Sequence, residues 1–287
     1  MSNDPAGAIP RSKRPLPVKT NLPTAGTPPL GLAEVWANLE LIQLFVWRDI
    51  KTRYKQTTVG ALWAILQPLL TMVIFTLLFN RVVKLPSDGV PYPAFALAAL
   101  IPWTYIVHGL TKSTISLTLN HELITKVYFP RLVIPISAVI AGLMDFAVSF
   151  LLLLALFFYY GVEPSLTWFA LPLFVVYVVL LTMGMGFWLS ALNVEYRDVA
   201  NALPFVTQSL LFVSPIAYSS SMIPEAWRMI YYLNPVAGVI DGFRWCLLGS
   251  GEGPHVGWAI SLLVTLSLLI GGAFFFRIRE ERFADVV

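Results

Sequence analysis

Charged residues divide the chain into long apolar stretches. A helix that crosses a bilayer needs about 20 mostly apolar residues, and six stretches meet that length if one of them is allowed to carry a single acid, Asp145. Because lipid cannot satisfy exposed backbone groups, continuous apolar runs of this length favour helices. The sequence therefore predicts an all-α, polytopic membrane protein with six spanning helices, over residues 61–80, 95–112, 134–159, 168–192, 200–218 and 256–276.

Lysine and arginine gather on one side of the predicted membrane. If both termini are cytoplasmic, the segments on that side hold fifteen basic residues, and these segments are 1–60, 112–131, 193–199 and 277–287. The opposite side holds four, in the segments 81–94, 160–167 and 219–255. Cytoplasmic loops carry the excess of Lys and Arg, so we expect a multi-pass membrane protein with both termini in the cytoplasm.

The composition excludes several other classes of protein. Of the 287 residues, 57% are hydrophobic and only 12% are charged, whereas an average soluble domain has about 25% charged residues. The net charge of +3 comes from residues placed between apolar runs, which argues against a nucleic-acid partner. A single cysteine, Cys246, excludes an intrachain disulfide, and the scattered histidines predict no metal site.

The segments before the first apolar run predict two further parts. Residues 1–31 contain seven prolines and no apolar run, which is typical of a disordered cytoplasmic tail. Residues 32–55 combine apolar side chains at helical spacing with a basic cluster, and predict an amphipathic helix in the cytoplasmic interface. The six-helix transmembrane domain would then occupy residues 56–287.

Two connecting segments are longer than ordinary turns. In the cytoplasmic loop 113–131, Asn120 is a plausible N-cap for a short helix that ends before Pro130. This loop is either a docking element or a simple connector. The outer segment 219–255 is broken at Asn234 and Pro235 into two pieces too short to cross, which predicts interfacial or re-entrant helices. Its aromatic residues form either a membrane belt or a collar at a channel mouth, and the collar candidates are Trp227, Tyr231 and Tyr232.

Several residues inside and between the predicted spans are candidates for chemistry or for helix packing. Asp145 is either a proton-relay group or a buried acid hydrogen-bonded to a neighbouring helix. Glu195 and Asp198 are the candidate acid pair of a membrane-embedded enzyme. Gly184 and Gly186 favour close helix packing. Because the chain has no Gly-x-x-x-x-Gly-Lys-Ser/Thr phosphate loop, we expect it to move a substrate without catalytic residues of its own.

Four motifs resemble those of ABC-2-type permeases that export O-antigen, capsule or teichoic acid, and the O-antigen branch is the most similar. The first is the segment 48–68, in which a basic stretch is followed by Gly60, Trp63 and Pro68, and the second is the loop 120–130. The third is the Asn-Val-Glu-Tyr-Arg-Asp-Val turn of 193–199, and the fourth is Pro215 followed by Asn234, Pro235 and Arg244. The resemblance implies a homodimer with two copies of a separate ATPase subunit. ATP and Mg would bind to that partner, and this chain would hold no cofactor.

The resemblance also implies a substrate and roles for particular residues. The substrate would be a lipid-linked polysaccharide of the O-antigen type; capsule, teichoic acid or a smaller lipid or drug are the alternatives. A further alternative is a membrane enzyme that acts on lipid-linked sugars, with Glu195, Asp198 or Asp145 as acid or base. Contacts to the ATPase are assigned to Asn120, Glu122, Lys126, Phe129 and Arg131. Arg53 and Lys55 would meet a lipid-linked pyrophosphate, or else serve only as positive-inside anchors. Residues assigned to the channel are Trp63, Phe75, Phe79, Phe205, Phe212 and Tyr218.

Overall fold

The computed structural model describes residues 32–55, 60–127, 129–251, 253–280 and 283 of the chain. These residues form helices and their connections, and no β-strand occurs among them. The all-α prediction is therefore confirmed. The predicted tail 1–31 lies outside the described residues.

Within the described part of the chain, five helical segments are long and apolar enough to cross a membrane. They comprise α3 (Gly60–Phe75) with the π-helical turn η2 (Thr76–Val82), α4 (Tyr92–Leu119), α6 (Val133–Ala141) with α7 (Leu143–Tyr160), η3 (Leu166–Ala170) with α8 (Leu171–Glu195), and α12 (Val256–Glu280). The sixth predicted span corresponds to α9 (Asp198–Val213), which is apolar but has only 16 residues. The count of six crossings stays a prediction.

The end of α9 differs from the predicted boundary at residue 218. The helix ends at Val213, and Ser214 has an extended backbone with ψ 154°. Pro215 follows directly, and a proline ring disfavours helical geometry in the residue before it. The chain therefore leaves α9 through six non-helical residues, 214–219, whose carbonyl groups need other partners.

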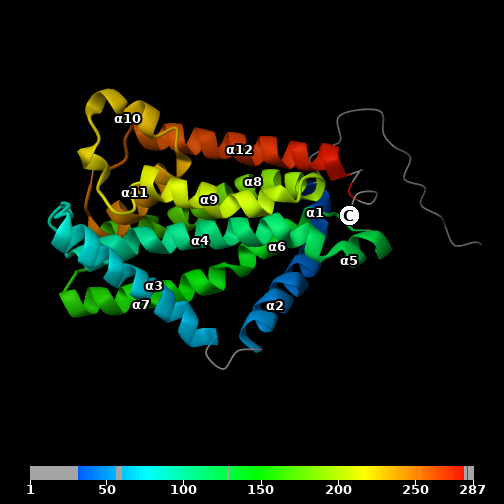
Figure 1. Ribbon diagram of the computed structural model, residues 1–287, viewed down its shortest axis with the longest axis horizontal. Helices are drawn as coiled ribbons and strands as arrows, with labels where there is room; N and C mark the ends of the chain where they lie inside the picture. Colours follow the sequence, from blue (N-terminus) through cyan, green and yellow to red (C-terminus); the bar gives the residue numbers. More distant parts are fainter. Residues whose placement is uncertain (1–31, 56–59, 128, 252, 281–282, 284–287) are drawn as a thin grey trace, which may run out of the picture.

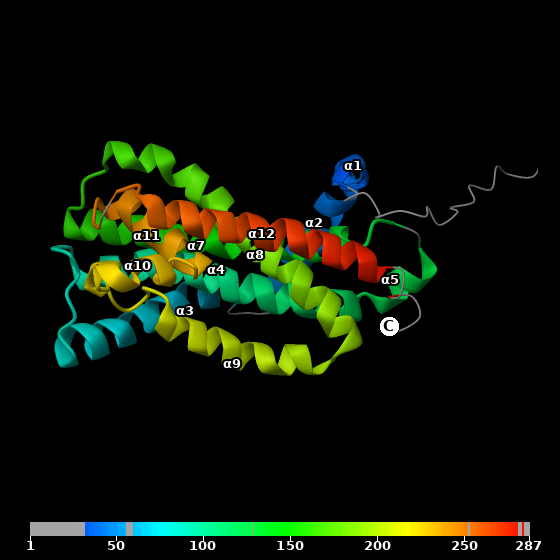
Figure 2. The same cartoon turned by 90° about the horizontal axis from the view of Figure 1, so that it is seen from above.

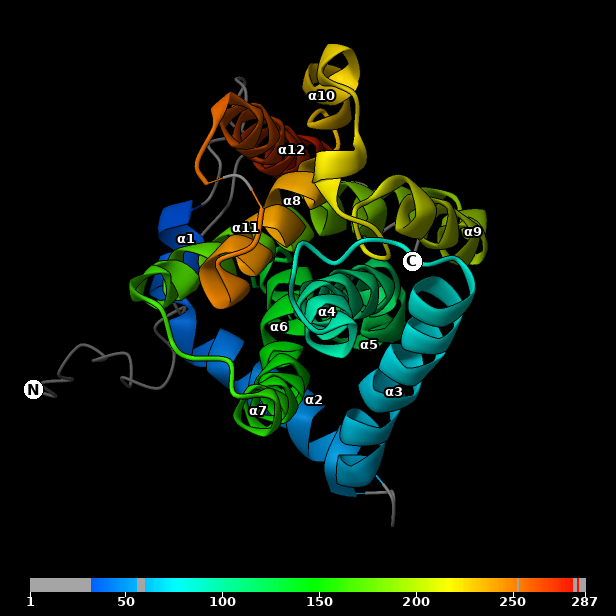
Figure 3. The same cartoon turned by 90° about the vertical axis from the view of Figure 1, so that its left-hand side faces the viewer.

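Helix α4 lies in the middle of the bundle. Most of its residues are buried, and it contacts α8, α6, α11, α7, α3 and α9. Figure 3 shows α4 surrounded by these helices when the molecule is viewed along its long axis. Glycines permit the close packing, as predicted: a Cβ at Gly186 would lie 2.6 Å from the Ser113 hydroxyl oxygen, and one at Gly184 would lie 2.8 Å from the Leu269 backbone nitrogen.

Short helices gather at the two ends of the bundle (Figure 1). One end carries α1 (Leu32–Ala37), α5 (His121–Lys126) and the end of α12. The basic-residue bias predicts that this end is cytoplasmic, and we call it the cytoplasmic end. From there α2 (Leu39–Lys55) runs diagonally and packs against α6. The predicted single helix over 32–55 is thus two helices with a turn at Asn38.

The opposite, outer end carries η4 (Ser220–Met222), α10 (Glu225–Tyr231) and α11 (Pro235–Leu248). The predicted break at Asn234 and Pro235 separates the last two helices. Asn234 caps α11 by accepting a hydrogen bond from the backbone N–H of Val236 at 3.1 Å. Figure 2 shows α10 and α11 beside the outer ends of the long helices.

Candidate functional site

A cavity of about 390 Å³ opens at the cytoplasmic end, between α2, the last turns of α4 and helix α6. Its wall contains three basic side chains, Arg48, Arg53 and Lys112, and one acid, Asp49. We call it the basic cavity. A concentration of positive charge beside apolar helices is suited to an anionic group that approaches from the membrane surface.

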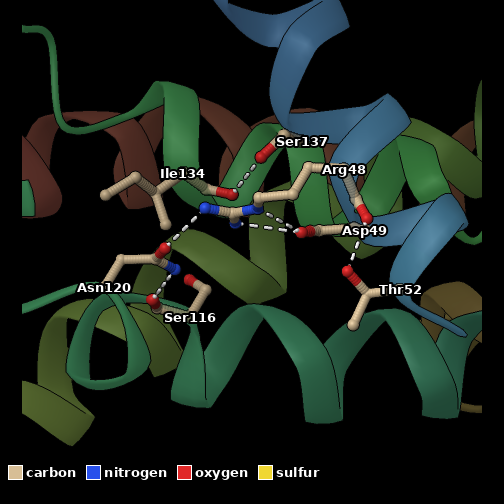
Figure 4. A network of polar contacts seen from close by, with 7 residues as sticks. All are labelled: Arg48, Asp49, Thr52, Ser116, Asn120, Ile134 and Ser137. Atoms are coloured by element: carbon tan, nitrogen blue, oxygen red, sulfur yellow. Dashed lines mark hydrogen bonds and ion pairs between the residues drawn. The ribbon is translucent and has the colours of Figure 1, made fainter. Parts of the chain in front are cut away.

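Arg48 lines the basic cavity and has two side-chain partners there. Its guanidinium donates to the Asn120 side-chain oxygen at 3.0 Å and pairs with Asp49 at 2.9 Å. The Asn120 amide donates in turn to the backbone oxygen of Ser116 at 2.8 Å (Figure 4). Asn120 stands at the predicted N-cap position of α5, but its side chain makes no capping bond. The predicted start of the helix is confirmed, but the side chain does not cap it, because it bonds to Arg48 of α2 and to the Ser116 carbonyl of α4 instead.

Arg53 forms an ion pair across helices with Asp145, in the first turn of α7. The two side chains are 31% and 21% exposed, so the pair is not sealed in the protein. Asp145 thus has a cationic partner on the helix before the first span. The side chains of Lys55 and Trp63 lie outside the described residues.

The five residues predicted to contact an ATPase divide into two groups. Glu122 and Lys126 are both 70% exposed on α5 and form an i,i+4 ion pair of 3.1 Å. The others turn inward: Asn120 bonds to Arg48, the Phe129 ring packs edge-on against Phe45 of α2 at 5.9 Å, and Arg131 contacts the end of α12. The loop therefore offers α5 to the solvent while its two ends are tied to neighbouring helices.

A network of ion pairs that sequence reasoning missed joins the cytoplasmic helix ends. The Glu280 carboxylate accepts from the Arg131 backbone N–H at 3.0 Å and pairs with Arg277 at 2.6 Å. Arg277 also pairs with Glu34 of α1 at 2.6 Å. Arg279 pairs with Glu195, the acid considered above for an enzyme. Arg277 and Glu280 are three residues apart on α12, but the other partners lie far apart in sequence, so only the fold brings them together.

A buried arginine organises the outer end. Arg244 of α11 is only 3% exposed, and its guanidinium donates to backbone oxygens of Pro215, Ile216 and Tyr218 at 2.6 to 2.9 Å. These are the carbonyls left without helical partners after α9. The guanidinium also lies 3.5 Å from the centre of the Phe95 ring.

Asp241 supplies the nearest negative charge to Arg244. Its carboxylate accepts a hydrogen bond from the Tyr232 hydroxyl at 2.8 Å. Burial raises the pKa of Asp241 above its usual range, while the Tyr232 hydrogen bond and the Arg244 charge oppose the rise. Burial also lowers the pKa of Arg244 to about 10, which leaves the guanidinium charged at neutral pH.

The aromatic residues predicted for a collar differ in exposure, although the rings of Tyr231 and Tyr232 contact each other edge-on at 5.7 Å. Tyr232 is buried, and its ring packs where Gly257 leaves room. The Tyr231 hydroxyl donates to the Tyr218 hydroxyl at 3.3 Å, while Trp227 is exposed. The predicted channel residues are similarly divided: Phe75 is buried and Phe79 partly buried, whereas Phe205 and Phe212 are exposed on α9. Their roles stay predictions.

Comparison with known proteins places the chain in a family. Residues 40–248 match the family model described as ABC-2 type transporter. The chain is 30% identical over 249 residues to the O-antigen export system permease protein RfbA of Klebsiella pneumoniae, covering 86% of this chain and 95% of the relative. It is 28% identical to the Myxococcus xanthus protein of the same name over 88% of this chain and 98% of the relative.

A further relative is the polysialic acid transport protein KpsM of Escherichia coli, which is 25% identical and matches 84% of this chain and 93% of its own length. The chain therefore belongs to the ABC-2 type transporter family and is a multi-pass membrane protein. The predicted family resemblance is confirmed. The likeness extends over 93 to 98% of the length of these relatives.

Proposed function

We propose that this chain is the transmembrane subunit of an ATP-driven exporter that moves a lipid-linked polysaccharide across the bacterial cytoplasmic membrane. The observation that carries the proposal is the match to O-antigen export permeases over nearly their full length. The basic cavity adds a site of suitable chemistry at the cytoplasmic end. Capsular polymer is the nearest alternative, because a polysialic acid transport protein is also among the relatives.

The diphosphate group of a lipid-linked substrate fits the basic cavity. Arginine binds phosphate oxygens through paired N–H donors, and lysine adds a compact charge. Arg48, Arg53 and Lys112 present these groups between α2, α4 and α6, beside the apolar surface where the lipid chain would stay. The chain thus needs no catalytic residue, since it binds and orients its substrate while a partner hydrolyses ATP.

Helix α5 is the docking element for the ATPase in this proposal. Its Glu122 and Lys126 face the solvent at the cytoplasmic end, and their opposite charges can pair with charges on a partner surface. ATP and Mg would bind to that partner. Both termini of this chain would lie on the same cytoplasmic side, in agreement with the basic-residue bias.

Two copies of the chain would enclose the conduit. Figure 3 shows α3 and α9 on the same side of α4. Both helices keep large apolar side chains exposed, including Ile74 and Leu77 on the first span and Phe205 and Phe212 on α9. Such a face suits contact with a second copy or with lipid, and we assign it to a homodimer with a channel between the copies.

The proposal is tested by purifying the tagged chain from its native membranes in a mild detergent. We expect a near-stoichiometric partner that carries a phosphate loop, and ATP hydrolysis that a lipid-linked glycan stimulates. Deleting the gene should remove a surface polysaccharide and leave its lipid-linked precursor inside the cell. A chain that purifies as a dimer without any ATPase would contradict the proposal.

A further inference from the structure

The basic cavity brings its own negative charges. Arg48 is paired with Asp49 of the same helix, and Arg53 with Asp145 of α7. Lys112 has no ion-pair partner among the described residues. We propose that Asp49 and Asp145 are internal counter-ions that the diphosphate group displaces from the two arginines when the substrate binds. This inference rests on the proposed function, because it assigns the regulation of the same cavity.

Counter-ions are needed because the cavity borders the membrane. Three cations that share one small cavity repel one another, and their repulsion is stronger near apolar helices than in water. With Asp49 and Asp145 counted, the net charge of the three cations and two acids is 3 − 2 = +1. The empty cavity can therefore remain folded and still attract an anion.

The exposure of both pairs suits an exchange. Arg48 and Asp49 are 40% and 32% exposed, and Arg53 and Asp145 are 31% and 21% exposed. Ion pairs that reach solvent contribute about 1 kcal/mol or less, so a group with more charge can replace the carboxylate. A diphosphate carries at least two negative charges and several acceptor oxygens, which match the forked donors of an arginine.

The two pairs differ in what their exchange does to the fold. Asp49 neighbours Arg48 on α2, so its loss leaves the helices connected as before. Asp145 lies on α7, so exchange at Arg53 removes an ion pair that joins α2 to the third span. Binding of the substrate would thereby loosen α2, the helix that also contacts the docking loop through Arg48 and Asn120. Occupancy of the cavity is thus transmitted to the loop.

The test measures binding of farnesyl diphosphate, a soluble prenyl diphosphate, to the full-length protein in lipid nanodiscs. Removing a competing carboxylate should tighten binding, by about fivefold for Asp145→Asn and about threefold for Asp49→Asn, because Asp145 is the less exposed of the two acids and competes more strongly. Arg53→Gln should weaken binding. Inorganic pyrophosphate should compete with the probe, and farnesol should not, because the exchange involves the head group alone.

A double variant separates exchange from a general change in charge. In Arg53→Gln with Asp145→Asn, the gain from removing Asp145 should vanish, because the two residues act through their contact. If the double variant keeps the gain over Arg53→Gln, the exchange is refuted. Glu163→Gln removes an equal charge from an exposed position at the outer end and should leave the affinity unchanged.

The remaining outcomes distinguish this inference from the proposed function. Equal or weaker binding by both Asp145→Asn and Asp49→Asn, with normal wild-type binding, overturns the exchange and leaves the exporter assignment intact. No binding by the wild-type protein overturns the cavity assignment as well, although co-purification of an ATPase would still support the exporter. If Asp145→Asn does not insert into the membrane, Asp49→Asn tests the same competition at a more exposed pair.

Discussion

The two ends of the bundle are held together by different interactions. At the cytoplasmic end, partly exposed ion pairs join separate helices, as in Arg53 with Asp145 and Arg277 with Glu34. At the outer end, the buried guanidinium of Arg244 satisfies several backbone carbonyls at once. Exposed ion pairs can be exchanged at little cost, whereas a buried arginine that loses its acceptors leaves a charge uncompensated. The cytoplasmic end is therefore suited to rearrangement, and the outer end to fixed geometry.

The largest effect is expected from Arg244→Met. The substitution removes the donor to the carbonyls of Pro215, Ile216 and Tyr218 and the positive charge near Asp241, so stability should fall by about 3 to 5 kcal/mol. Thermal unfolding in detergent measures this loss. Arg244→Lys should recover only part of it, because one ammonium group cannot reach all the carbonyls. Arg81→Met, which changes an exposed arginine at the same end, should have little effect on stability. Equal losses in both variants would show that the carbonyl contacts of Arg244 do not stabilise the outer end.

A smaller loss is expected from Glu280→Gln at the cytoplasmic end. The amide keeps an oxygen for the Arg131 N–H but loses the charge that pairs with Arg277, so stability should fall by about 1 to 2 kcal/mol. Because Glu280 connects the docking loop to α12, the ratio of polymer exported to ATP hydrolysed should fall as well. Glu225→Gln, in the exposed first turn of α10, serves as the control and should preserve that ratio.

Asn120→Ala tests the hydrogen bond that joins α2 to the loop 113–131, which contains α5. The alanine removes one acceptor from Arg48 and one donor to Ser116. The stability of the folded protein should fall by about 1 kcal/mol. Amide hydrogen exchange should become faster in α2 and α5 while α11 keeps its protection. Asn201→Ala, an exposed position on α9, should leave α2 unchanged. Unaltered exchange in the first variant would show that the Asn120 bond does not hold the two helices together.

The long helices and the outer break could be predicted because their signals are local. Charge-free runs and the pair Asn234 and Pro235 are visible in a window of the sequence. Proline alone was a poor guide, since Pro68, Pro102 and Pro204 lie inside helices while Pro215 follows the end of one. A membrane bundle tolerates such prolines when neighbouring groups satisfy the freed backbone.

The polar contacts of the candidate site could not be predicted. Asp145 was identified as an intramembrane acid, but its partner Arg53 lies 145 − 53 = 92 residues earlier in the chain. Arg131 and Glu280 are 149 positions apart. Arg244 was recognised as part of a family motif, yet its carbonyl partners depend on where α9 ends. Such pairings follow from helix packing, which a single sequence does not encode in any local pattern.

The smallest change in stability is expected at α5, but the effect on export there should be large. Glu122 and Lys126 are exposed, so Glu122→Lys should change stability by less than about 0.5 kcal/mol. If α5 docks on an ATPase, the reversed charge should still reduce export several-fold, because charges at the rim of an interface govern association with the partner. Co-purification of the ATPase measures docking directly, and Glu163→Lys at the outer end is the matched control. Normal docking and export by the Glu122 variant would show that the exposed charges of α5 do not bind the partner.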